Sequence, residues 1–217
     1  MSIAIKSSGS APTVSSLRLL ATLGGAGALA GFLIVSAYTA TLPGIEANRA
    51  ATLDLAIREV LPRVERYDTL YLQAGVLSTE APQADPAHKP ETLYAGFDAN
   101  GALVGFAAAV HEPGFQEPIE ILFGFDPRTK ASLGLAILMS RETPGLGDKI
   151  QDERWRQQFG GRMLPLTGIK TGGAETDATI HMVTGATISS RAVIGAVNKG
   201  VERWMPHVTR YLQGGRS

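Results

Sequence analysis

The stretch TLYAGFDANGALVGFAAAV, residues Thr92–Val110, carries the clearest fold signal in the chain. Thr92–Phe97 has the composition of a strand, and Asp98–Gly101 (DANG) has that of a tight turn. A second apolar run, Ala102–Val110, follows at once. The stretch therefore predicts a hairpin of two antiparallel strands.

The sequence after this hairpin predicts more strands and then helices. Strands are predicted over Ile119–Phe125, Ser132–Ser140 and Thr179–Val183, and a short helix over Gln151–Phe159. A longer helix is predicted over Ile188–Trp204. Its apolar stripe consists of Ile188, Ile194, Val197, Val201 and Trp204. Grouped strands flanked by helices predict an α+β fold with a mixed, largely antiparallel sheet.

Upstream of the hairpin lies a long charge-free segment. Leu19–Ile45 contains 27 residues without a charged side chain. A membrane-spanning helix needs about 20 apolar residues, whereas a cleaved signal peptide has an apolar run of about 7–15. We therefore expect residues 19–42 to form an uncleaved transmembrane helix, with a cleaved signal as the alternative. Lys6 and Arg18 precede it, so the positive-inside rule predicts a cytoplasmic N-terminus.

The segment between this helix and the hairpin is expected to be a helix followed by a loop. Pro43 and Gly44 predict a break after the membrane, and Ile45–Tyr67 has the spacing of an amphipathic helix. Pro82, Pro86 and Pro90 predict a surface loop. The expected parts are a cytoplasmic N-terminus (1–18), a transmembrane helix (19–42), an amphipathic helix with its loop (43–90) and a C-terminal domain (91–217).

Composition excludes several classes of function. The 217 residues include 20 basic and 20 acidic side chains, and Lys6 and Arg18 are the only charges before Glu46. The remainder has a net charge of −2, so no nucleic-acid partner is expected. Without cysteine, the chain has no disulfides, thiolate metal sites, cysteine-bound iron–sulfur clusters or cysteine nucleophile. The four histidines lack metal-ligand spacing, so we expect no metal site.

One candidate site is TGATISSR, Thr184–Arg191, directly before the last predicted helix. Thr187 is placed as the N-cap, and the first helical turn then offers free backbone N–H groups and the positive end of the helix dipole to an anion. Gly185 and Ala186 leave the Thr187 hydroxyl accessible. A plain N-cap after a glycine turn would have the same pattern.

A second candidate is ETPGLGDKI, Glu142–Ile150. One proline and two glycines predict a tight loop with small side chains, where a flat ligand could lie close to the backbone. An ordinary strand-to-helix connection is the alternative.

These two stretches, in this order and behind one N-terminal span, resemble the FMN-binding domain family. The likeness is strongest to the G subunit of the Rnf-type ion-translocating electron-transport complex. The C subunit of the sodium-translocating NADH:quinone reductase is a more distant relative. The segment LPGIEANRA, Leu42–Ala50, is also similar to the G subunit.

The resemblance implies a covalent cofactor. FMN would be joined through its phosphate to Thr187 as a phosphoester, making the chain a phosphoprotein, and a separate flavin transferase would supply it from FAD. The same likeness implies that the Glu142–Gly147 loop lies near the isoalloxazine. The residues expected at the cofactor are Thr184, Gly185, Ala186, Thr187, Ile188, Ser189, Glu142, Thr143, Gly145 and Leu146. His181 stands where the family commonly has aspartate, six residues before the modified threonine.

The resemblance also implies a function. The chain would be a single-pass flavoprotein of the inner membrane, with its C-terminal domain in the periplasm. It would relay electrons inside a complex that couples electron transfer between ferredoxin and NAD to movement of Na⁺ or H⁺. The other membrane subunits would be its partners, and alone it would not be catalytic. The alternatives are an anchored assembly module without a redox role, and a flavin electron donor to a different membrane reductase.

Overall fold

The computed structural model describes residues 15–83, 90–170 and 172–214. Most of the expected N-terminal segment 1–18 lies outside these residues, as do Pro86 and His88 of the expected loop. The chain forms two compact units, Met1–Ala50 and Ala51–Ser217.

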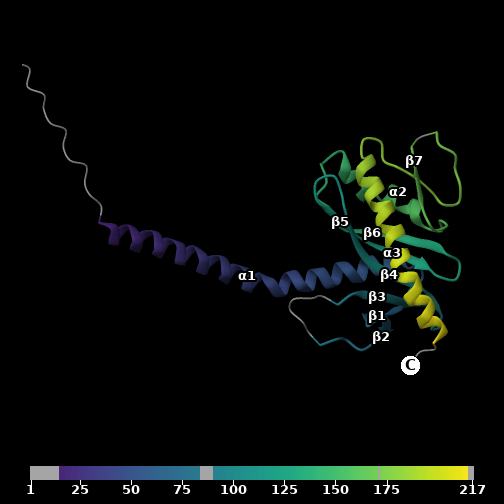
Figure 1. The fold of residues 1–217 in the computed structure, drawn as a ribbon, viewed down its shortest axis with the longest axis horizontal. Helices are drawn as coiled ribbons and strands as arrows, with labels where there is room; N and C mark the ends of the chain where they lie inside the picture. Colours follow the sequence, from purple (N-terminus) through teal and green to yellow (C-terminus); the bar gives the residue numbers. More distant parts are fainter. Residues whose placement is uncertain (1–14, 84–89, 171, 215–217) are drawn as a thin grey trace, which may run out of the picture. The chain divides into compact units, whose positions relative to one another are not determined.

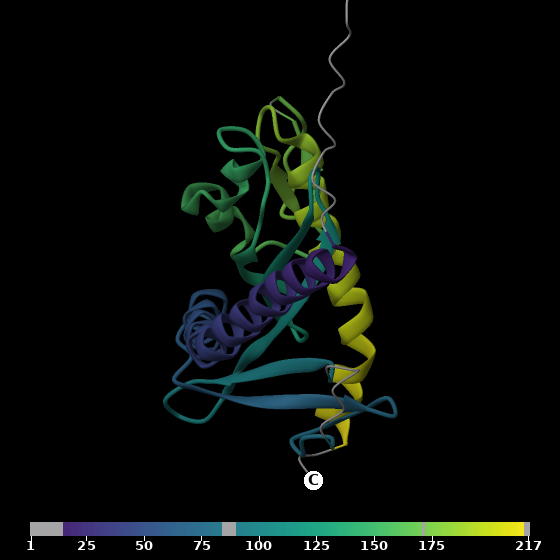
Figure 2. The same cartoon turned by 90° about the vertical axis from the view of Figure 1, so that its left-hand side faces the viewer.

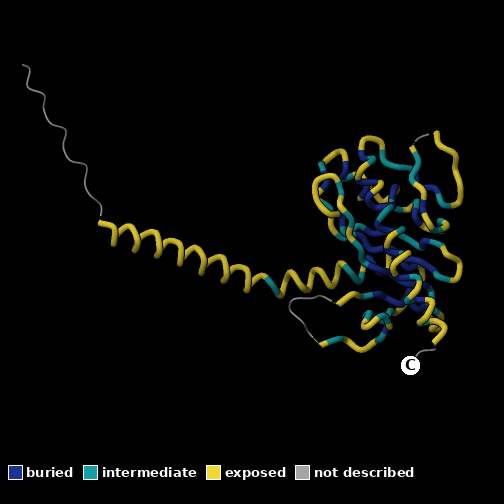
Figure 3. Tube along the Cα trace, in the orientation of Figure 1, coloured by how far each residue is buried: buried dark blue, intermediate teal, exposed yellow. Residues whose placement is uncertain are grey.

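Helix α1 runs without interruption over Ser16–Val60. It is the one helix among the described residues that is long and apolar enough to cross a membrane, and none of its most apolar stretch is buried (Figure 3). The predicted break at Pro43 and Gly44 is wrong, because Pro43 lies inside the helix. A proline lacks only its own N–H bond to the carbonyl four residues earlier, and the surrounding turns continue.

A six-stranded antiparallel sheet forms the centre of the second unit (Figure 1). Its spatial order is β2-β1-β3-β4-β5-β6. The strands are β1 Arg66–Gln73, β2 Val76–Ser78, β3 Thr92–Phe97, β4 Leu103–Pro113, β5 Pro118–Asp126 and β6 Ala131–Met139. The predicted hairpin is β3–β4, in which Leu93 lies opposite Ala108. The α+β fold with a largely antiparallel sheet is confirmed.

Strands β1 and β2 were not predicted from the sequence. The helix predicted over Ile45–Tyr67 ends at Val60, and β1 begins at Arg66. Pro62 explains the early end, because a proline disfavours helical geometry in the residue before it. Ala74 and Gly75 both have positive φ, 48° and 81°, and make the two-residue turn between the strands.

Strand alternation gives the sheet two apolar faces. Phe106 and Ala108 of β4 belong to one core cluster, whereas Ala107, between them, belongs to the other. Helix α3 (Thr187–Gln213) covers the first face, and the end of α1 covers the second (Figure 2). On the second face a Cβ at Gly124 would lie 2.2 Å from the Val60 carbonyl oxygen, so this glycine lets α1 approach the sheet.

The segment between β6 and α3 is built from short pieces. The helix predicted over Gln151–Phe159 is divided into α2 Glu153–Arg156 and η2 Gln157–Phe159, and η1 Gly147–Gln151 precedes them. Strand β7 (Thr167–Ile169), which was not predicted, pairs in parallel with β8 (Thr179–His181). Within the stripe predicted for α3, Ile194, Val197 and Trp204 are buried. Ile188 is 53% exposed, because Ser189, Ser190, Ala192 and Val193 form the buried face of the helix start instead.

Candidate functional site

The TGAT segment forms the entry to α3. Ala186 is the N-cap, because its carbonyl accepts the first helical hydrogen bond, from the Ser190 N–H at 2.9 Å. Thr187 is therefore the first helical residue, and the prediction that it is the N-cap is wrong. Since no side chain caps this helix, the Thr187 hydroxyl is not committed to a capping bond.

The start of α3 has the features of an anion site. The N–H groups of Thr187, Ile188 and Ser189 donate to no atom in the part of the chain that the structure describes. The helix is 27 residues long, so its dipole adds positive charge at this end. Gly185 precedes it with φ of 84° and no side chain, and Thr187 is half-buried. These residues fit a phosphate group held beside or on Thr187.

The second candidate loop is organised by the buried side chain of Glu142, which is 5% exposed. Its Oε1 accepts hydrogen bonds from the backbone N–H groups of Phe115 (2.8 Å) and Gln116 (3.2 Å). Its Oε2 accepts a 2.7 Å hydrogen bond from the Ser189 hydroxyl. One carboxylate therefore joins the β4–β5 turn, the Glu142–Gly147 loop and the first turn of α3.

Two glycines enclose this carboxylate. A Cβ at Gly114 would lie 2.3 Å from Oε1 of Glu142, and a Cβ at Gly147 would lie 2.6 Å from Oε2. The loop also approaches the TGAT turn, since a Cβ at Gly185 would lie 3.5 Å from the Leu146 side chain. The two segments that the sequence singled out are thus neighbours in the fold.

The remaining candidate residues differ in what they contact. The Thr143 hydroxyl accepts a 2.8 Å hydrogen bond from the Gln116 amide. Gly145, with φ of 75°, and Thr184 are exposed. Leu146 and Ile188 are about half exposed, at 49% and 53%. The Glu142–Gly147 loop and the first turn of α3 thus each present one partly exposed apolar side chain.

The β4–β5 turn that Glu142 binds was not predicted from the sequence. Gly114–Glu117 lies between Pro113 and Pro118, and this proline-flanked pattern was the available signal for a turn. The hydrogen bonds from this turn to Glu142 join residues 26 and 27 positions apart in the chain. A local sequence pattern cannot predict such contacts.

His181 lies at the end of β8 and is tied to the short helices. Its carbonyl accepts a 2.8 Å hydrogen bond from the Trp155 indole N–H, and its backbone N–H donates to the Gln158 side chain. Its ring Nε2 lies 2.9 Å from a Glu175 carboxylate oxygen. The backbone at this position is therefore held by two side chains, and the imidazole has an acidic partner.

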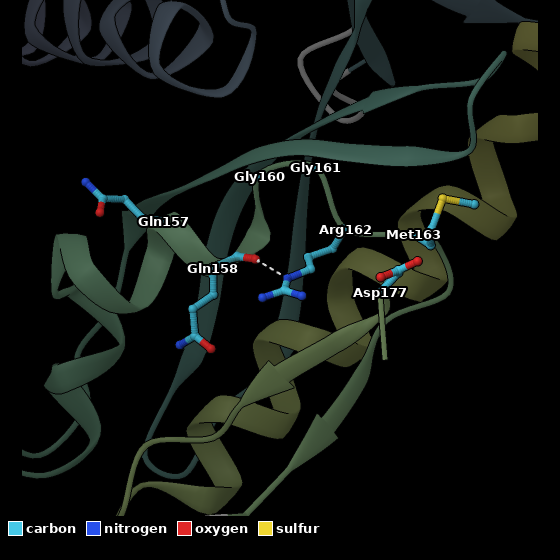
Figure 4. A pocket seen from close by; sticks show the side chains of 7 residues that line it. All are labelled: Gln157, Gln158, Gly160, Gly161, Arg162, Met163 and Asp177. Atoms are coloured by element: carbon cyan, nitrogen blue, oxygen red, sulfur yellow. Dashed lines mark hydrogen bonds between the residues drawn. The ribbon is translucent and has the colours of Figure 1, made fainter. Parts of the chain in front are cut away.

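Other parts of the second unit do not share this site. The described residues contain no cluster of three or more side chains that could hold a metal ion. A pocket of about 360 Å³ lies between η2 and Asp177, where the Arg162 Nε donates to the Gln158 carbonyl (Figure 4). None of the residues lining it belongs to the Glu142 loop or the TGAT turn.

Comparisons with known proteins match these segments. Residues 114–202, which include the Glu142 loop and the TGAT turn, match the FMN-binding domain family. The G subunit of the ion-translocating oxidoreductase complex of Pseudoalteromonas atlantica is 30% identical over 76% of this chain and 77% of its own length. The chain belongs to this family. The predicted resemblance of the chain to G subunits is thereby confirmed.

A second relative of this chain is named as a subunit of a specific complex. A solved structure supports the fold. The G subunit of the Na⁺-translocating ferredoxin:NAD⁺ oxidoreductase complex of Acetobacterium woodii is 29% identical, over 73% of this chain and 76% of its own length. The crystal structure of Shewanella oneidensis NqrC covers 71% of this chain and 88% of its own, with a TM-score of 0.57 and 19% identity. At that identity the likeness establishes the fold alone.

Proposed function

We propose that this chain is a membrane-anchored flavoprotein subunit that carries FMN as a phosphoester on Thr187. It relays electrons within an ion-translocating ferredoxin:NAD oxidoreductase complex, alongside the other membrane subunits. The observation that carries the proposal is the start of α3, where a half-buried threonine follows a glycine turn and adjoins three N–H donors without acceptors in the described chain.

The start of α3 suits a phosphoester electrostatically. A phosphodiester keeps one negative charge, and the N–H groups of Thr187, Ile188 and Ser189 with the helix dipole favour negative charge there. When bound, FMN supplies the redox chemistry, and the chain tethers and orients it. The apolar surfaces of Leu146 and Ile188 suit contact with a flavin ring, in keeping with the role proposed for the Glu142–Gly147 loop.

Attachment requires a separate flavin transferase with FAD as the donor. The Thr187 oxygen attacks the FAD phosphorus that bears the riboflavin half. A new O–P bond forms while the pyrophosphate bond breaks, AMP leaves, and the hydroxyl proton passes to a base on the transferase. No atom changes its oxidation state in this step.

The attachment site can be tested with matched threonine variants. The full-length chain is produced with a flavin transferase and run on a denaturing gel. We expect flavin fluorescence for the wild type and for Thr184→Ala, which removes an exposed hydroxyl three residues earlier, and none for Thr187→Ala. Fluorescence that persists in Thr187→Ala would refute the attachment site. A wild-type chain without flavin would favour the anchored assembly module instead.

We further propose that α1 anchors the chain in the inner membrane with its C-terminal domain on the periplasmic side. Its charge-free stretch follows Arg18, and none of its most apolar window is buried. Alkaline phosphatase fused after Ser217 should be active in a bacterial host, because that enzyme needs the oxidising periplasm. An inactive fusion, with an active one at the N-terminus, would reverse the orientation.

A further inference from the structure

Most of the hydrogen-bonding capacity of the Glu142 carboxylate is used within the protein. Its two oxygens already accept three hydrogen bonds, from the Phe115 and Gln116 N–H groups and the Ser189 hydroxyl. Gly114 and Gly147 lie so close that neither has room for a Cβ. On the two sides that these glycines occupy, there is therefore no room for a ring system. The hydrogen bonds that its carboxylate accepts all come from the protein around it.

The bond to Ser189 fixes the rotation of the first turn of α3. Successive residues of an α-helix are about 100° apart around the axis, so Ser189 and Thr187 are about 200° apart. When Ser189 points inward to Glu142, Thr187 is turned away from it. The exposures agree, since Ser189 is 2% exposed, whereas Thr187 is half-buried and Ile188 is 53% exposed.

A second hydrogen bond holds the same helical turn through the next residue. The Ser190 hydroxyl, which is fully buried, accepts a 3.0 Å hydrogen bond from the Val183 N–H. Ser190 thus holds the segment between β8 and the TGAT turn, while Ser189 holds the loop that carries Glu142. With both serines committed, Thr187 is the one hydroxyl of the first helical turn that has no partner in the described chain.

From this arrangement we infer that Glu142 is a positioning residue, which acts through Ser189 to present the Thr187 hydroxyl to the flavin transferase. The inference rests on the proposed function, because it assumes that Thr187 is the residue modified. It assigns Glu142 no contact with the flavin. Its negative charge beside the helix start adds to the stability of the arrangement.

The test compares initial rates of flavinylation of the full-length chain in detergent, with purified transferase and FAD. Glu142→Ala removes all three bonds, and its rate should fall by about tenfold or more, equivalent to about 1.4 kcal/mol. Glu142→Gln keeps an acceptor for the two N–H groups and offers an N–H to the Ser189 oxygen, so its rate should stay within about threefold of the wild type. The control is Glu117→Gln, which removes a charge from the same turn without touching Ser189, and its rate should not change.

A double variant tests whether Glu142 acts through Ser189. Because Glu142→Ala and Ser189→Ala remove the same bond, the chain with both changes should be modified no more slowly than Glu142→Ala alone. Multiplied losses would mean that the two residues act independently, and would overturn the proposal. So would a wild-type rate for Glu142→Ala, or a Glu142→Gln rate as low as that of Glu142→Ala.

Amide hydrogen exchange gives a readout that needs no flavin. In Glu142→Ala the N–H groups of Phe115, Gln116 and the first turn of α3 should exchange about tenfold faster, and Glu142→Gln should restore their protection. Unchanged exchange would overturn the positioning role, whatever the flavinylation result. If the exchange effects appear but the wild type takes up no flavin, the coupling of loop and helix stands and the proposed function fails.

Discussion

The Ser189 hydroxyl donates a 2.7 Å hydrogen bond to Glu142, a residue 47 positions earlier in the chain. Both side chains are buried. This bond joins the ETPGLG segment to the helical turn that follows TGAT. From the sequence alone, only the order of these two segments along the chain was known. The backbone around Thr187 thus depends on a loop at the far end of β6.

Loss of the Ser190 hydroxyl should destabilise the second unit. Ser190→Ala leaves the partly buried Val183 N–H without its acceptor, which costs about 1 kcal/mol of unfolding free energy. Urea unfolding measures the difference. Thr209→Ala is the control on the same helix, because its exposed hydroxyl bonds only to a helical carbonyl, and it should change stability by less than about 0.5 kcal/mol. Equal effects of the two changes would contradict the prediction.

Two glycines of α3 should respond oppositely to a methyl group. A Cβ at Gly200 would lie 2.6 Å from the buried Phe123 ring, so Gly200→Ala should cost about 1–3 kcal/mol of unfolding free energy. Gly195 has open space around it, and Gly195→Ala should stabilise the helix by about 0.5–1 kcal/mol. Thermal unfolding midpoints of the two variants should move in opposite directions. A higher midpoint for Gly200→Ala would contradict the close contact between α3 and Phe123.

The Asp126–Arg128 pair should make stability depend on pH. Burial raises the pKa of the Asp126 carboxyl, but the hydrogen bonds and charge of Arg128 outweigh burial and hold the pKa below its usual value. A lowered folded-state pKa means that the pair stabilises the fold above the unfolded pKa of about 3.9. That stabilisation is lost as the pH falls through the folded-state pKa.

Urea unfolding of the wild type and Asp126→Asn at several pH values checks this dependence. The difference in unfolding free energy should be largest near neutral pH and shrink below about pH 4. Arg128→Gln breaks the same pair and should follow the same trend. A difference that grows in acid would contradict the assigned direction of the pKa shift.

The end of α1 should be required for the second unit to fold. Ile57, Val60 and Leu61 are fully buried against one face of the sheet, and each such side chain contributes about 1.5–3 kcal/mol. Together they rival the stability of a whole domain, about 5–15 kcal/mol. We expect residues 51–217 to fold alone and residues 66–217 to lose cooperative thermal unfolding. Circular dichroism distinguishes the two, and a cooperative transition for 66–217 would disprove the dependence.

Local patterns predicted the fold where they agreed with the tertiary packing. The β3–β4 hairpin was predicted because a four-residue turn separates two apolar runs. Strands β1 and β2 were missed because the apolar spacing before Arg66 resembles one long helix, and Ala74 is an unusual residue for a turn with positive φ. The continuity of α1 through Pro43 was missed because a proline usually signals a break.

The candidate site was predicted as two segments but not as one structure. The unpaired N–H groups at the start of α3 follow from the helix pattern, although the cap is Ala186 and not Thr187. The role of Glu142 could not be predicted, because it depends on partners 26 to 47 residues away. Such long-range pairing depends on how the β4–β5 turn, the loop after β6 and the start of α3 pack together, which the sequence does not encode locally.

The hydrogen bond between Ser189 and Glu142 also has a consequence for the time at which the chain could be modified. It joins residues 47 positions apart, so it needs both the loop after β6 and the first turn of α3 to be in place. If the proposed function is correct, a nascent or misfolded chain lacks the geometry that presents Thr187. The transferase would then not modify it. Flavin incorporation would then act as a proofreading step, so that only chains with a completed domain enter the membrane complex as redox-competent subunits.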